Sequence, residues 1–177
     1  QSFTINVANT NDAPAFTSTP TTSAIEDAGY SHTAAASDID IGDSLAFAAQ
    51  TLPAWLNFDG TATISGTPLN EHVGTHEVIL TVSDLGGATD GQIFTINVAN
   101  TNDSPVLIVA DTSMAEDTLL TISLSASDVD NTELNFSASS DTTAVTVSVD
   151  DDTLTMVPVA DWNGTANITV TVSDGEL

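Results

Sequence analysis

The chain of 177 residues contains no lysine, no arginine and no cysteine, and only 5% of its residues are aromatic. It has 25 Asp and Glu residues and three histidines, which gives a formal net charge of −25. Nucleic acid and anionic membranes both require a basic surface, so we expect neither as a partner. Clustered carboxylates repel one another in the compact state, and dissolved cations are therefore the expected partners.

The missing cysteines exclude disulfides, thiolate metal sites and cysteine nucleophiles together. The sequence also lacks an apolar run of about 18 residues and a basic-then-apolar leader, so we expect neither membrane insertion nor a secretion signal within it. The hydrophobic share of 41% is ordinary and permits packed cores. An acidic, cysteine-free composition rich in Thr, Ser and Asn is typical of an exported prokaryotic protein from a saline habitat.

A decapeptide, FTINVANTND, occurs twice, at residues 3–12 and 94–103. Further motifs recur at an offset of 90 residues: Glu-Asp at 26 and 116, Asp-x-Asp at 38 and 128, and Val-Ser-Asp at 82 and 172. The repeat predicts a first domain at 13–102 and a second at 103–177, preceded at 1–12 by the last strand and linker of another repeat. The second domain is expected to lack its final strand, as in a window cut from a longer tandem array.

Apolar and small polar residues alternate with period two along many short segments. In the decapeptide strand, Phe94, Ile96 and Val98 fall on one face, and residues 78–82 and 168–172 show the same alternation. Such Thr-, Val- and Ile-rich runs, separated by Gly, Pro, Asn and Asp, predict antiparallel strands with one buried face. We therefore predict an all-β chain of two tandem antiparallel β-sandwich domains of the Ig or cadherin type.

The acidic residues concentrate near the ends of the predicted strands, at the same offsets in both repeats. The Asp-x-Asp and Val-Ser-Asp motifs would meet at the pole where the chain enters a domain, close to the Asn- and Asp-rich linker at 100–103. Carboxylates, amide carbonyls and backbone carbonyls are the oxygen ligands that calcium requires. The alternative is that Asp and Asn simply favour turns and solvated surfaces, which explains less well why they recur at equal offsets.

The combined motifs resemble the cadherin-like superfamily across nearly the whole chain. Residues 52–58 (LPAWLNF) and 64–68 (ISGTP) look like the dystroglycan-type cadherin-like domain of bacterial surface proteins. Residues 157–164 (VPVADWNG), followed by Val-Ser-Asp-Gly, are similar to the tandem cadherin-like repeats of giant bacterial adhesins. This resemblance implies an extracellular calcium-binding module, secreted or at the cell surface, with adhesion or spacing as its role.

The resemblance also implies sets of calcium ligands, with Ca²⁺ as the cofactor. At the junction between the domains the set is Glu26, Glu71 with its neighbour Asn70, Asn100, Asn102, Asp103, Asp128, Asp130 and Asp174. A second set at the start of the first domain is Asn11, Asp12, Asp38, Asp40 and Asp84, and a third begins at Glu116 and Asp161. The linker starts with Asn, and Leu69–His72 replaces the Asp-Arg-Glu motif of cadherins, so fewer ions per junction or weaker binding are expected.

Other candidate sites receive less support. His72 and His76, with Glu71 and Glu77, have the spacing of a zinc site on a helix, but the segment is strand-like and surface histidines are expected instead. Trp55 and Trp162 could stack on a sugar, but their apolar neighbours favour core positions. No nucleophile motif supports catalysis, and we expect no enzyme.

Three functions follow from these observations. The first is a rigid spacer or adhesive stalk whose junctions are stiffened by calcium, with neighbouring repeats as its partners. The second is a binding module for polysaccharide or for calcium-dependent self-association. The third is a head-to-tail filament in which residues 3–9 of one copy complete the open sheet of another, as in donor-strand exchange.

Overall fold

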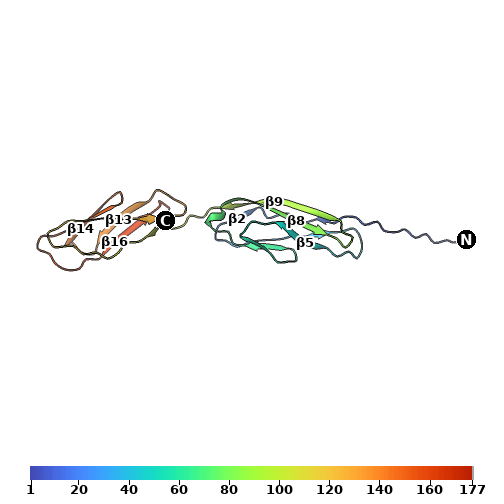
Figure 1. Ribbon diagram of the computed structural model, residues 1–177, viewed down its shortest axis with the longest axis horizontal. Helices are drawn as coiled ribbons and strands as arrows, with labels where there is room; N and C mark the ends of the chain where they lie inside the picture. The colour runs from blue at the N-terminus through green and yellow to red at the C-terminus, as the bar shows by residue number, and fades with distance from the viewer. Residues whose placement is uncertain (177) are drawn as a thin grey trace. The chain divides into compact units, whose positions relative to one another are not determined.

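The computed structural model describes residues 1–176, and only Leu177 of the expected second domain lies outside the described residues. The chain divides into two compact units, Gln1–Thr101 (unit 1) and Asn102–Leu177 (unit 2). The described residues fold into strands and one 3₁₀ turn, η1 at Asn70–His72 (Figure 1). None of them forms a helix long and apolar enough to cross a membrane. The predicted all-β class is confirmed.

Unit 1 contains nine strands in two main sheets and one short ladder. The strands are β1 (Ala15–Phe16), β2 (Ser23–Ile25), β3 (Tyr30–Thr33), β4 (Ala36–Ser37), β5 (Ala46–Thr51), β6 (Leu56–Phe58), β7 (Thr63–Gly66), β8 (Gly74–Ser83) and β9 (Thr89–Ala99). The larger sheet has the order β2-β9-β8-β5, the smaller one β3-β7-β6, and β1 pairs with β4 (Figure 1). These pairs are antiparallel except β2–β9, which is parallel and departs from the predicted antiparallel arrangement.

The alternation in the sequence directs the apolar side chains of unit 1 into one core. Val78, Leu80 and Val82 on β8 are at most 2% exposed, and Ile96 on β9 is fully buried. Both strands face β3, β6 and β7, whose Ile64 is also fully buried. The period-two prediction for these strands is therefore confirmed, because each buries every second side chain.

Trp55 lies inside this core, as its apolar neighbours predicted. It is 6% exposed and makes an edge-to-face contact with Tyr30, with ring centroids 5.6 Å apart. The Tyr30 hydroxyl donates a hydrogen bond to the Thr21 carbonyl at 2.7 Å, and burial raises the pKa of Tyr30 to about 12. Such edge-to-face packing anchors the smaller sheet of unit 1.

Unit 2 repeats the plan, and its longest strands have six residues, against 10 and 11 in β8 and β9. The strands of unit 2 are β10 (Val106–Leu107), β11 (Leu120–Ser123), β12 (Ala126–Ser127), β13 (Asn135–Ser140), β14 (Val145–Asp150), β15 (Thr153–Pro158) and β16 (Ile168–Ser173). One sheet has the order β11-β15-β14, while β13 pairs with β16 and β10 with β12. Leu154 and Met156 on β15 are at most 5% exposed and form the centre of its core. The inward-facing Ile168, Val170 and Val172 are only half-buried.

The turn between β6 and β7 is closed by the Asp59 carboxylate. It accepts hydrogen bonds from the backbone N–H of Thr61 (2.7 Å), Ala62 (3.0 Å) and Thr63 (3.1 Å), and from the Thr61 hydroxyl. The hydrogen bonds from Thr61, followed by that from Thr63, lower the pKa of Asp59 from 3.8 to about 2. The charged form of Asp59 is thus favoured by folding.

This turn predicts an acid-dependent loss of stability in unit 1. Because the folded pKa lies below the unfolded one, the contribution is present above pH 3.8 and is lost as pH falls through about 2. Asp59→Asn, which retains an acceptor but no charge, is expected to lower stability at neutral pH and to flatten the pH dependence in that window. Urea unfolding at neutral and at acidic pH measures both effects. An equal loss at all pH values would contradict the role of the charge.

Candidate metal centre

The acidic residues at the N-terminal pole of unit 1, where the chain enters it, form one hydrogen-bonded cluster. The Asn11 side chain donates from Nδ2 to Asp84 Oδ2 (2.9 Å), and the Asp12 backbone N–H donates to Asp40 Oδ2 (2.7 Å). The Asp40 N–H in turn donates to Asp38 Oδ1 at 2.8 Å. Carboxylate oxygens of Asp38, Asp40 and Asp43 all lie within 4.8 Å of one another. This spacing is short enough for one cation to contact all three.

Unit 2 repeats the same contacts at its own N-terminal pole. Asn102 Nδ2 donates to Asp174 Oδ2 (2.5 Å), the Asp103 N–H to Asp130 Oδ2 (2.7 Å), and the Asp130 N–H to Asp128 Oδ1 (2.7 Å). These are the equivalents, at offsets of 90 and 91 residues, of the three bonds in unit 1. The two units share only part of their sequence, so the cluster is a conserved feature of the repeat and is not set by general surface acidity.

Each cluster contains carboxylate oxygens that are buried and receive no hydrogen bond among the described residues. They are Oδ2 of Asp38 and Asp43 in unit 1 and Oδ2 of Asp128 in unit 2. Asp38 and Asp128 are equivalent positions, so the same oxygen is left without a donor twice. A buried carboxylate oxygen without a donor is costly unless a cation neutralises it. The atoms that each cluster offers to a metal ion are all oxygens, which are the ligands that calcium prefers.

Burial, repulsion and hydrogen bonds within the unit 1 cluster shift the pKa values of two of its carboxylates in opposite directions. Partial burial, followed by repulsion from Asp38, Asp84 and Asp40, raises the pKa of Asp43 above its ordinary value. The pKa of Asp84 is lowered, chiefly by the hydrogen bond from Asn11 and also by backbone N–H groups including that of Ala88. Asp84 is thus already stabilised as an anion, whereas Asp43 lacks a positive partner.

The pole of each unit opposite this cluster brings together the remaining predicted residues less tightly. Glu26 is 2% exposed, and its Oε2 accepts a hydrogen bond from the Thr101 N–H at 3.1 Å. The equivalent Glu116 is exposed, but Asp117 beside it accepts a hydrogen bond from the Asp161 N–H at 2.9 Å. Asn100 and Glu71 are exposed at the same end of unit 1. Of the predicted residues at these poles, Glu26 is buried and Glu71, Asn100, Glu116 and Asp161 are exposed.

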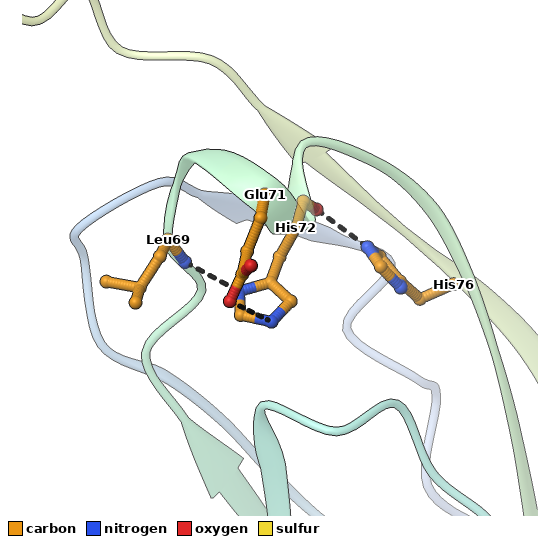
Figure 2. Close-up of polar contacts among 4 residues, drawn as sticks. All are labelled: Leu69, Glu71, His72 and His76. Atoms are coloured by element: carbon orange, nitrogen blue, oxygen red, sulfur yellow. Dashed lines mark hydrogen bonds and ion pairs between the residues drawn. The ribbon is translucent and has the colours of Figure 1, made fainter. Parts of the chain in front are cut away.

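Both ring nitrogens of His72 and Nε2 of His76 contact other groups (Figure 2). His72 Nδ1 accepts from the Leu69 N–H at 2.9 Å, and His72 Nε2 lies 3.7 Å from Glu71 Oε1. His76 Nε2 lies 2.6 Å from the His72 carbonyl oxygen. Both rings are half-buried beside Trp55, with centroids 6.5 and 5.9 Å from it, so the two histidines are partly exposed and also pack against the edge of the core.

The two tryptophans differ in how far their rings are exposed to solvent, and so in whether they could stack on a sugar. Trp55 is enclosed in the core of unit 1 and offers no face for stacking on a sugar, as its apolar neighbours in the sequence led us to expect. Trp162 is half-buried against the core of unit 2, and its ring lies over Gly164. This second position agrees with the expected core packing more than with an exposed platform.

Three residues of the clusters were not predicted. Asn9 donates from Nδ2 to Asp40 Oδ1 (2.8 Å), and Asn131 donates to Asn102 Oδ1 (2.8 Å) and Asp174 Oδ2 (3.3 Å). Asp43 joins Asp38 and Asp40. Asn9 could have been found, because it is the repeat equivalent of Asn100, and Asn131 directly follows the Asp-x-Asp motif. Asp43 has no comparable sequence signal, since its counterpart at an offset of 90 is Glu133.

The two units match different families of known proteins. Residues 13–99 match the family model described as "Putative Ig domain", and residues 101–177 match the one described as "Cadherin-like domain". No curated protein sequence matches the chain. The expected cadherin-like resemblance is thus confirmed for the second half, whereas the first half matches an Ig-like model. Domains of these two kinds are typically non-enzymatic, and cadherin-like domains are extracellular.

Solved structures with TM-scores above 0.5 show the same fold at low identity. Human protocadherin-24 EC1-2 is 17% identical with a TM-score of 0.59, over 91% of this chain and 87% of that chain. PcdhgB3 EC1-4 is 18% identical with a TM-score of 0.58, over 92% of this chain and 46% of that chain. An endo-fucoidan hydrolase of glycoside hydrolase family 107 is 22% identical with a TM-score of 0.44, and the chain spans only 27% of its length. The chain is therefore a tandem pair of Ig- and cadherin-like β-sandwich domains, of the kind found in extracellular adhesion and spacer modules.

Proposed function

We propose that the chain is a calcium-binding spacer or adhesive stalk segment of a secreted or surface-anchored bacterial protein. The observation that carries this proposal is the duplicated carboxylate cluster, with Oδ2 of Asp38 and of Asp128 buried and without a donor. Calcium takes about six to eight oxygen ligands, and each cluster supplies carboxylates, amide oxygens and backbone carbonyls. The bacterial origin rests on the composition alone.

The stiffening role follows from how the chain connects the two units. Thr101 is the last residue of unit 1 and is bonded to Glu26, while Asn102 is the first of unit 2 and is bonded to Asp174. A single peptide bond thus joins a residue fixed at one pole to a residue fixed at the next. Calcium held by Asn102, Asp103, Asp128, Asp130 and Asp174 would restrict rotation about this link.

Calcium binding itself is tested by titration calorimetry with the full chain. The wild type is expected to bind calcium more tightly than magnesium, since magnesium demands a stricter octahedral geometry. Asp128→Asn is expected to lose one binding event, while the matched control Asp111→Asn, which removes an exposed acid outside the clusters, retains all of them. If the two variants lost calcium binding equally, the acids would act only as general surface charge, and a specific calcium site would be contradicted.

Stiffening is measured separately, so that it can fail while binding succeeds. The absence of native cysteine allows one label in each unit, at Thr95→Cys on β9 and Thr169→Cys on β16, both exposed. Calcium is expected to narrow the distribution of distances between the labels in electron-spin resonance. If the distribution of label distances did not change at saturating calcium, the chain could still bind calcium, but the proposed stiffening would be contradicted.

A further inference from the structure

Unit 2 has a side-chain amide at a cluster position where unit 1 has an aliphatic residue. Asn131 directly follows the Asp-x-Asp motif of unit 2, and its equivalent at the offset of 90 residues is Ile41. Ile41 is fully exposed to solvent, whereas Asn131 is half-buried and bonded to the cluster. The two clusters share the three hydrogen bonds described above, so this position is one at which their chemistry differs.

The Asn131 amide connects two oxygens that come from distant parts of unit 2. Its Nδ2 donates to Asn102 Oδ1 at 2.8 Å and to Asp174 Oδ2 at 3.3 Å. Amide and carboxylate oxygens are the kinds of ligand that calcium takes. The two hydrogens of an amide NH₂ group are donors with partial positive charge, and they are attracted to the same oxygens as a cation. The Asn131 amide and a calcium ion therefore require the same acceptors.

Asp174 receives one more donor at this oxygen than its equivalent in unit 1. Asp174 Oδ2 accepts from Asn102 Nδ2 as well as from Asn131. In unit 1, Asp84 Oδ2 accepts from Asn11 at 2.9 Å, and isoleucine at the position of Asn131 has no donor to add. The negative charge of Asp174 is thus compensated to a larger extent by the chain itself.

Unit 1 places a third carboxylate beside the same motif. Carboxylate oxygens of Asp43, Asp38 and Asp40 lie within 4.8 Å of one another, and Asp43 Oδ2 is buried without a donor among the described residues. Like charges at this separation repel one another, and a bound cation relieves that repulsion. In unit 2 the donors of Asn131 relieve part of the corresponding repulsion without an ion.

The Asn131 side chain can leave the cluster without disturbing the backbone of its loop. The Asn131 backbone N–H donates to Asp128 Oδ1 at 2.8 Å, beside the bond from the Asp130 N–H at 2.7 Å. These two bonds hold the loop between β12 and β13, and rotation about χ1 and χ2 moves the amide alone. Release of the amide breaks its two side-chain hydrogen bonds and leaves the loop in place.

Given calcium binding by the clusters as proposed above, we propose that the Asn131 amide takes the place of the cation in calcium-free unit 2. It competes with calcium for Asn102 Oδ1 and Asp174 Oδ2, and it turns toward solvent when the ion binds. Asn131 therefore stabilises unit 2 without calcium and lowers the affinity of its cluster for calcium. Unit 1 has no such competitor at Ile41.

The competition is tested by calorimetric titration of the full chain with calcium. Asp38→Asn is present in every protein and weakens the cluster of unit 1, so the heat reports on unit 2. Asn131→Ala deletes the amide and is expected to tighten calcium binding by about tenfold, since the two hydrogen bonds no longer have to break. Asn163→Ala, at an exposed position in the loop between β15 and β16, is the matched control and is expected to bind calcium as the parent does.

The release of the amide is observed directly by nuclear magnetic resonance. The Asn131 side-chain NH₂ signals are identified by their absence from the spectrum of Asn131→Ala. Without calcium these hydrogens are bonded to two acceptors and are expected to exchange slowly with water, and calcium is expected to speed their exchange. Unchanged exchange at a calcium concentration that fills unit 2 would overturn the inference, because the amide would still hold both oxygens.

Thermal unfolding in chelator distinguishes competition from a general loss of packing. Asn131→Ala is expected to lower the melting temperature of calcium-free unit 2, because Asn102 and Asp174 lose a donor, while it raises the affinity for calcium. A residue that only packs, or one whose Oδ1 binds the ion, would lower the affinity instead. If the parent bound calcium and Asn131→Ala bound it no more tightly, the inference would fail and the calcium site would stand. If neither protein bound calcium, the proposed function would fail as well.

Discussion

Calcium is expected to raise the melting temperature of the chain by roughly 10–20 °C, and excess chelator to reverse the shift. A ligand present at about a hundredfold over its dissociation constant stabilises the folded state by about 2.7 kcal/mol per site. One kcal/mol shifts the melting temperature of a domain of this size by about 4–8 °C. The expected shift in melting temperature therefore corresponds to one calcium ion bound at each cluster. Differential scanning calorimetry of the same sample with calcium and then with chelator measures it.

Asp128→Asn is expected to act with opposite signs in the two conditions. Without calcium, asparagine still accepts the hydrogen bonds from Asp130 and Asn131 through Oδ1. It replaces the buried oxygen that lacks a donor by the uncharged Nδ2, and so removes one negative charge from a cluster that also contains Asp130 and Asp174. The substitution should therefore stabilise calcium-free unit 2 by about 1 kcal/mol or more. With calcium, the loss of an anionic ligand should lower stability instead. No simple loss of packing produces this change of sign.

Two controls separate binding from charge screening. Sodium chloride at matched ionic strength screens repulsion among all 25 acids without occupying a site, so it is expected to give a smaller shift than calcium. Asp38→Asn should alter the transition of unit 1 in the same way that Asp128→Asn alters that of unit 2. If salt reproduced the whole shift, or if both variants responded to calcium as the wild type does, the clusters would not be calcium sites.

The strands of unit 1 could be predicted from the sequence because they depend on a local pattern of alternating residues. Period-two alternation decides which side chains face the core, as Val78, Leu80 and Val82 confirm. The recurrence of Asp-x-Asp and Val-Ser-Asp also predicted which acids meet, since alternate loops of a sandwich lie at opposite poles. The bonds from Asn11 to Asp84 and from Asn102 to Asp174 show this agreement within each unit.

Other features depend on contacts that the sequence does not encode locally. The parallel pairing of β2 with β9 is set by how the chain crosses between sheets, so the three residues of β2 give no sign of it. Asp43 reaches Asp38 and Asp40 only through the path of the loop that joins β4 to β5. The half-burial of His72 and His76 follows from Trp55, which lies far away in sequence. The first and the last are tertiary contacts, while the position of Asp43 depends on the conformation of its own loop.

Gly66→Ala is expected to destabilise unit 1 by about 3 kcal/mol or more, although it adds a single methyl group. A Cβ at Gly66 would lie 1.9 Å from the Trp55 carbonyl oxygen and 3.3 Å from the Leu56 Cα. These are backbone atoms of the segment leading into β6, and Gly66 pairs with Leu56 in the ladder between β6 and β7. No rotamer change relieves the contact, so the two strands must separate or the core beneath Trp55 must open.

The matched control is Gly91→Ala on β9, where the nearest atom to a new Cβ, the Leu80 carbonyl oxygen, is 4.0 Å away. This position is exposed, and its substitution is expected to change stability by no more than about 0.5 kcal/mol. Each unit contains one tryptophan, so Trp162→Phe leaves Trp55 as a fluorescence probe of unit 1 alone during urea unfolding. If both glycine variants unfolded at the same urea concentration, the close approach of β7 to the Trp55 backbone would not contribute to stability. If only Gly66→Ala lost stability, the glycine of the Ile-Ser-Gly-Thr-Pro motif would be explained by the space it leaves for Trp55.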